Sequence, residues 1–168
     1  MKRLTSILVF SLLLAVCGNN VLWSEAEEQE ECETIKATQV VTADLSTFTT
    51  TGTISGDLKG TTAFTGDATS LTPISAASTP PLSPTLSYTG TLVITTKKGT
   101  LTTRAVGIFE SVPFGSGTQF DRVIGGTGKC EGATGLLFFS FTANADLSGF
   151  TSAVTGELCL DDTAHDDR

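Results

Sequence analysis

The sequence predicts an all-β protein, folded as an eight-stranded antiparallel closed β-barrel. From residue 37 onward the chain is rich in threonine, valine, phenylalanine and glycine, and no stretch repeats its apolar residues with a helical period. Turn residues separate short runs in which apolar and polar side chains alternate. Consecutive antiparallel strands of this number can close without leaving an edge, while two packed sheets are the alternative that the pattern leaves open.

The strands are expected between clear turn signals. We predict them at residues 38–44, 47–55, 57–67, 86–96, 100–110, 119–125, 136–145 and 150–160. The connection over residues 68–84 contains Pro73, Pro80, Pro81 and Pro84, which cannot extend a central strand, so it is a candidate lid or rim. The tripeptide Lys97-Lys98-Gly99 predicts a compact hairpin.

Alternation predicts which side chains face the interior. In the strand at 86–96 the apolar set includes Tyr88, Leu92 and Ile94, and the strand at 57–67 adds Phe64. The strand at 100–110 points Leu101, Ala105 and Phe109 one way and Val106 and Ile108 the other, and the strand at 136–145 is apolar on both faces. Something therefore covers the outside here, and we expect either a subunit interface in a homo-oligomer or the N-terminal segment.

The N-terminal residues predict export. Lys2 and Arg3 precede an apolar run over residues 7–16 that is too short to span a bilayer, which is typical of a secretory signal peptide, here cleaved after Ala26. A lipoprotein attached at Cys17 is the competing interpretation, and Val16 disfavours it. We expect a signal peptide at 1–26, an acidic leader at 27–36, the barrel domain at 37–160 and an acidic tail at 161–168 in a secreted, extracellular or periplasmic protein.

Charge and cysteine usage narrow the function classes. A net charge of -8 argues against nucleic-acid binding, because phosphate contacts dominate that affinity, and no basic patch would draw the domain to a membrane. Removal of the signal peptide leaves Cys32, Cys130 and Cys159, and export favours one oxidised pair. We expect Cys32–Cys159, with Cys130–Cys159 as the rival pairing. Because the only histidine, His165, lies in the tail, no metal site is expected.

A glycine-dense stretch over residues 125–135, with the sequence GGTGKCEGATG, lies between two predicted strands. Glycine at this density indicates a tightly constrained connection, and the stretch enters a strand rather than a helix, which argues against a phosphate-binding loop. The pattern resembles the signature region of the allene oxide cyclase and dirigent β-barrel superfamily, and the similarity extends over residues 86–160. The resemblance implies an eight-stranded barrel with an apolar lumen, often oligomeric, that steers the cyclisation or coupling of a small molecule without a cofactor.

Few residues are candidates for chemistry. Arg122 shares its predicted strand face with Phe120 and Ile124, which would turn it into the interior as a clamp for an anionic ligand, unless it is a rim arginine or a bulge flips the register. Asp121 and Glu110 are expected on the outer, polar faces, where either could line the mouth as an acid–base group. The lumen candidates for ligand binding are Arg122, Tyr88, Phe120, Phe64 and Phe109.

These observations predict a secreted barrel that binds a small apolar molecule in its lumen, with no cofactor. If it is an enzyme, it is a cofactor-independent isomerase or cyclase that folds its ligand by shape and orientation. The alternative is a non-catalytic surface or assembly module that uses the barrel as a scaffold and the apolar outer face as its interface.

Overall fold

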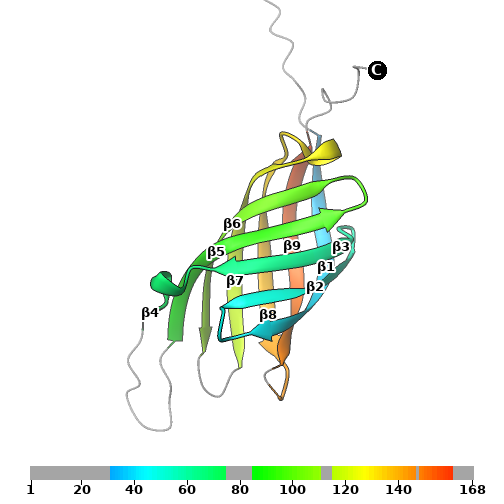
Figure 1. The fold of residues 1–168 in the computed structure, drawn as a ribbon. Helices are drawn as coiled ribbons and strands as arrows, with labels where there is room; N and C mark the ends of the chain where they lie inside the picture. Colours follow the sequence, from blue (N-terminus) through cyan, green and yellow to red (C-terminus); the bar gives the residue numbers. More distant parts are fainter. Residues whose placement is uncertain (1–30, 75–84, 111–114, 147, 161–168) are drawn as a thin grey trace, which may run out of the picture.

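The chain folds into a closed antiparallel β-barrel (Figure 1). The computed structural model describes residues 31–74, 85–110, 115–146 and 148–160. Its strands are β1 (Glu31–Asp44), β2 (Thr49–Gly56), β3 (Gly60–Gly66), β4 (Thr72–Pro73), β5 (Thr85–Thr96), β6 (Thr100–Glu110), β7 (Ser116–Gly126), β8 (Thr134–Ala143) and β9 (Gly149–Leu160). They pair in the order β3-β2-β1-β9-β8-β7-β6-β5-β4, and a further β3–β5 pairing closes eight of them, with the short β4 flanking β5. The predicted eight-stranded barrel is confirmed.

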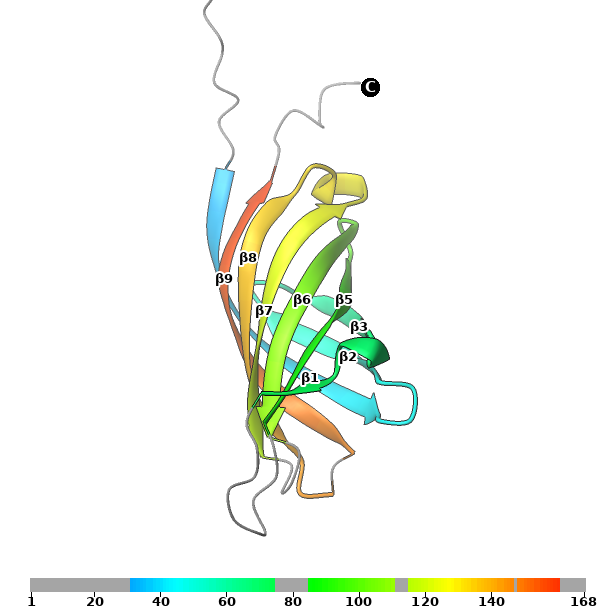
Figure 2. The same cartoon turned by 90° about the vertical axis from the view of Figure 1, so that its left-hand side faces the viewer.

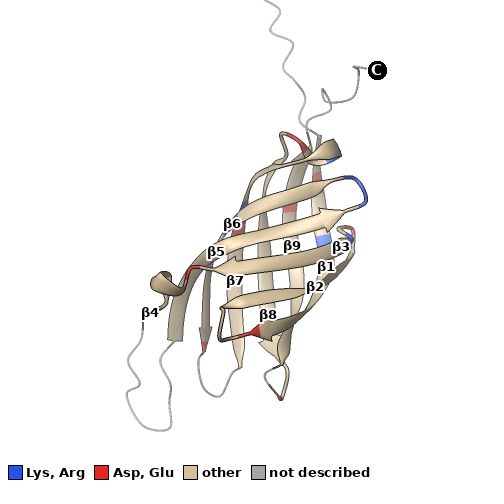
Figure 3. Ribbon diagram, viewed as in Figure 1, with Lys and Arg blue, Asp and Glu red and all other residues tan. Residues whose placement is uncertain are grey.

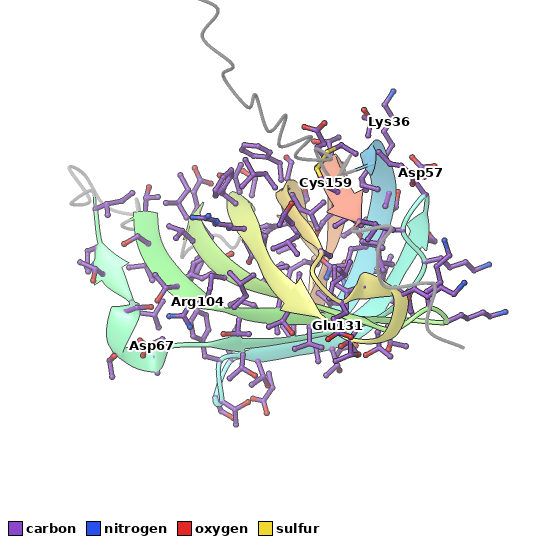
Figure 4. All side chains as sticks on the ribbon, turned by 90° about the horizontal axis from the view of Figure 1, so that it is seen from above. Lys36, Asp57, Asp67, Arg104, Glu131 and Cys159 are labelled. Atoms are coloured by element: carbon purple, nitrogen blue, oxygen red, sulfur yellow. A yellow bond between two sulfur atoms is a disulfide. The ribbon has the colours of Figure 1, made fainter. Side chains whose placement is uncertain are left out.

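The two open ends of the barrel differ in the strand ends and turns that form them. Strand β1 begins beside the end of β9, where Cys32 and Cys159 are register partners and form a disulfide (Figures 2 and 4). The predicted Cys32–Cys159 pairing is therefore present, and Cys130 is a free, buried thiol, so the rival pairing does not form. We call this the disulfide end, and the end that carries the β1–β2 and β8–β9 turns the cavity end.

Aliphatic side chains fill the interior at the disulfide end. Ile35, Ile54, Leu101 and Leu158 are buried there with Cys130 of the short 3₁₀ turn η2 (Gly128–Cys130). The glycine-dense stretch forms this turn, and its backbone amides bind the neighbouring β5–β6 hairpin: the Thr127 N–H donates to the Thr100 carbonyl and the Lys129 N–H to the Lys98 carbonyl. The stretch therefore closes one end of the barrel, and it does so as a loop between strands.

Several boundaries differ from the prediction. Strand β1 starts at Glu31 rather than at residue 38, because residues 31–37 pair with β9, so the barrel includes most of the predicted acidic leader. Strand β3 is shorter than predicted, and a second 3₁₀ turn, η1 (Ala68–Ser70), and β4 occupy the start of the proline-containing connection. The predicted signal peptide, acidic tail and remaining prolines of that connection lie outside the described residues. Among the described residues there is no helix with the length and apolar character needed to cross a membrane.

Candidate functional site

Strand β7 faces the interior with its polar residues, against the prediction. Gln119, Asp121 and Val123 point inward, and Asp121 is 0% exposed, whereas Phe120, Arg122 and Ile124 are exposed on the outside. The pairing of β7 with β6 sets this orientation, because directly paired residues share a face and the buried Ala105 pairs with Asp121. The prediction of Arg122 and Phe120 in the lumen is therefore wrong, as is the expectation of an exposed Asp121.

The inward orientation of Asp121 is possible because both of its carboxylate oxygens accept hydrogen bonds. The Thr103 hydroxyl donates to Oδ2, and the Gln119 Nε2 group donates to Oδ1 at 2.7 Å. A buried carboxylate is costly without such partners. Burial raises the pKa of Asp121 to about 6, and the hydrogen bonds from Thr103 and Gln119 hold it from rising further. This carboxyl group therefore titrates close to neutral pH.

Tyr88 extends this network toward the cavity end. Its hydroxyl donates to Gln119 Oε1 at 2.8 Å, which links Tyr88, Gln119 and Asp121 in one hydrogen-bonded chain. The ring lies against Gly107 on β6, where an added Cβ would sit only 2.2 Å from the ring, so glycine is required at that position. Burial, together with the charge of Asp121, raises the pKa of the Tyr88 phenol, which keeps it protonated as a donor.

A cavity of about 70 Å³ lies beside this chain, at the cavity end. Seven aromatic rings line it, namely those of Phe48, Phe64, Tyr88, Phe109, Phe139, Phe141 and Phe150. Its polar lining includes Gln119 on one side and, on the other, Gln39 and Ser152. The Gln39 amide is itself fixed, because its Nε2 group donates to the Thr62 hydroxyl at 3.1 Å and its Oε1 accepts from the Ser152 hydroxyl at 3.2 Å.

Phe48, in the turn between β1 and β2, forms part of the cavity's mouth. Its φ of 54° is in the left-handed region, where a non-glycine residue is strained. The ring packs edge-on against Phe64 and Tyr88, with centroid distances of 6.0 and 5.6 Å, and it also contacts the glycine at position 66. The turn is held by Asp44, whose Oδ1 accepts from the Ser46 amide and hydroxyl. Aromatic contacts and a capped turn therefore maintain a strained residue over the cavity.

The dimensions of the cavity limit what it can hold. Its 70 Å³ is less than half of the roughly 150 Å³ of an engineered apolar cavity that binds benzene. Because Phe48 is only half-buried and sits on a turn, it is the wall residue with the most freedom to move outward. The site suits a small molecule that is mainly apolar, with one polar group directed at an amide or hydroxyl of the lining.

The structure brings together some of the predicted site residues and separates others. Tyr88, Phe64 and Phe109 line one cavity, and their role in ligand binding remains a prediction. Glu110 is exposed at the end of β6, and Arg122 lies on the outer face. Sequence reasoning missed Phe48, Gln39 and Gln119. The signal for Gln119 was its spacing of two from Asp121, which puts both on one strand face.

Neither a metal centre nor a known relative guides the assignment. Within residues 31–160, the described part of the chain contains no group of three or more His, Cys, Asp or Glu side chains placed to hold a metal ion. No protein-family model matches the chain, and no curated protein matches it either.

Proposed function

We propose that this protein binds a small, predominantly apolar molecule in the cavity at the cavity end of its barrel. The observation that carries the proposal is a cavity walled by aromatic rings and bordered on two sides by fixed glutamine amides, Gln39 and Gln119. Ligand sites combine a mainly apolar wall with a few placed polar groups, which set orientation and specificity. Buried amides stabilise a fold less than apolar packing of the same volume does, which supports a role for Gln39 and Gln119 beyond packing.

Binding is favoured over catalysis. The group best suited to proton transfer is Asp121, but it does not line the cavity, because Gln119 and Tyr88 stand between them. A general acid or base must lie within hydrogen-bond reach of the proton that it moves. In our proposal Asp121 orients the Gln119 amide, and any cyclisation or isomerisation of the ligand follows from the shape of the cavity.

The proposal includes export and membership of the allene oxide cyclase and dirigent-like superfamily. The signal-peptide pattern of residues 1–26 supports export, as does the Cys32–Cys159 disulfide, since such bonds persist in oxidising compartments. The glycine-dense stretch and the eight-stranded barrel support the family assignment.

The first test is native mass spectrometry of the purified protein, with organic extraction of any bound compound. Phenol, which has one ring and one hydroxyl, then serves as the probe, and saturation-transfer NMR reports its binding. We expect Ala43→Leu, which fills the cavity from β1, to abolish phenol binding. The matched control is Thr42→Leu on the outward face of the same strand, which should bind as the wild type does. If the purified wild-type protein contains no bound compound and does not bind phenol, the proposal is wrong and the cavity is only a gap in the packing of the core.

The outer face favours a second candidate function, that of a non-catalytic assembly module. Large apolar side chains on β6, β7 and β8 are exposed together, including Val106, Phe120 and Phe138. A contiguous apolar surface of this kind marks interaction sites in soluble proteins. This role can coexist with ligand binding because the two surfaces lie on opposite sides of the same strands.

A further inference from the structure

The outer surface of β6 to β9 is arranged in rows that the strand pairing defines. One row contains Arg104, Arg122, Leu136 and Glu157, which are direct cross-strand neighbours on β6, β7, β8 and β9. The next row toward the cavity end contains Val106, Phe120, Phe138 and Thr155. All eight residues are exposed, and the rings of Phe120 and Phe138 stack edge to face with centroids 4.8 Å apart.

The first row is asymmetric in charge. Its β6 and β7 positions are cations that oppose each other across the strands, which costs stability, while its β9 position is a carboxylate. Charged side chains are otherwise sparse along the strands (Figure 3). Arg104 lies on the same side of the barrel as Asp67 (Figure 4). The Thr69 hydroxyl and amide, which donate hydrogen bonds to Asp67, lower the pKa of that aspartate, and the charge of Arg104 adds a smaller lowering. The cationic side of the row, on β6 and β7, can therefore face the anionic side, on β9, of a second copy that is turned by half a rotation.

A two-fold axis can relate the two copies in this way. It lies in the plane of contact, parallel to the strands and between β7 and β8. It places β6 of one copy against β9 of the other and β7 against β8. Arg104 then faces Glu157 of the second copy, Arg122 faces Leu136 one strand away from that same Glu157, and Phe120 faces Phe138, each contact occurring twice. Such self-complementarity is what an isologous dimer interface requires. A central aromatic cluster with charges toward its edge is the usual anatomy of an interface.

We propose that the outer face of β6 to β9 binds a second copy of this chain in a two-fold dimer with this register. The inference rests on the assembly role and is independent of the cavity. Other occupants fit less well, because an anionic surface would meet Glu157 and a cationic one would meet the two arginines.

Sedimentation equilibrium and native mass spectrometry of the purified protein test the proposal. We expect a wild-type dimer. Phe138→Lys, at a position 52% exposed in the single chain, should give a folded monomer, because it buries a cation opposite Phe120. Glu157→Arg should raise the dimer dissociation constant by about tenfold or more, since it sets arginine against Arg104. Adding Arg104→Glu to it should restore the dimer, and Glu33→Arg, an equal charge change on β1 outside the rows, should have no effect.

Each other outcome overturns the inference. A monomeric wild type shows that this face does not bind a second copy, and a ring or filament shows that the contact is not two-fold. A dimer that survives Phe138→Lys uses a different surface. Failure of Arg104→Glu to rescue Glu157→Arg disproves the proposed register. Phenol binding by the Phe138→Lys monomer separates this result from the cavity proposal, which predicts that binding is unchanged.

Discussion

The two ends of the barrel are built from the same eight strands with opposite chemistry. At the disulfide end the interior is aliphatic, the glycine-dense turn closes the barrel, and Cys32–Cys159 joins the first strand to the last. At the cavity end the interior is aromatic, it includes two amide networks, and a strained residue, Phe48, lies at the mouth. The comparison indicates a division of labour, in which one end supplies stability and the other tolerates less favourable groups.

The polar residues of the cavity end show how that tolerance is achieved. Among the described residues no buried side-chain nitrogen or oxygen lacks a hydrogen-bond partner. Gln39, Gln119 and Asp121 are therefore compensated, but their networks gain less than the same volume of apolar packing would. Retaining them is reasonable if their orientation serves a ligand.

We expect the largest loss of stability from removal of the disulfide bond. Replacing Cys32 and Cys159 with serine should lower the free energy of unfolding by about 2–5 kcal/mol, because the bond constrains the unfolded chain across a sequence separation of 127. Urea denaturation measures the change, with Cys130→Ser as the control for loss of a thiol outside the bond. Phenol binding under native conditions should persist in the double variant. Equal stability with and without the bond would refute the assignment of stability to this end.

The second effect concerns Asp121 and the pH. Burial raises the pKa of Asp121 in the folded protein to about 6, above the ordinary value of 3.8 for an aspartate, so between these values the folded state holds the proton more tightly than the unfolded state. Stability from this group is therefore present at low pH and is lost as pH rises, by about 2 kcal/mol between about pH 4 and pH 6. Asp44, Asp67 and Asp146 have lowered pKa values and act in the opposite direction, so the comparison must be with a variant.

Asp121→Asn is that variant, since it keeps the shape and can still bond with Gln119 and Thr103. We expect the wild type to lose stability relative to Asp121→Asn as the pH rises through this window, as measured by urea denaturation at each pH. A constant difference between the two proteins would mean that the carboxyl group does not titrate there, and Asp121 would then have no part in tuning the cavity end.

The sequence predicted the disulfide end better than the cavity end. Strict alternation of aliphatic residues, as in Ile94, Leu101 and Leu158, can be satisfied in only one orientation of the strand, because these side chains must leave water. Strand β7 has two possible orientations, since either Phe120 and Ile124 or Gln119 and Asp121 could face inward. The choice depends on Thr103 and Tyr88, on other strands, whose hydrogen bonds stabilise the polar set. No pattern within one strand contains that information. Phe48 was missed for a related reason, because its contacts across the lumen form only when the barrel closes.

We expect the smallest loss of stability, but the clearest change in phenol binding, from substitutions of Phe48 at the cavity end. Phe48→Ala removes a half-buried ring from the mouth and should cost only about 1–2 kcal/mol, less than the loss of a fully buried phenylalanine. Phe48→Gly removes the same ring but suits the positive φ of 54°, so it should be about 1 kcal/mol more stable than the alanine variant. Both variants open the cavity, and saturation-transfer NMR should show phenol bound several-fold more tightly than in the wild type. Unchanged phenol binding in both would mean that Phe48 does not restrict entry, and the strain at this position would then need another explanation.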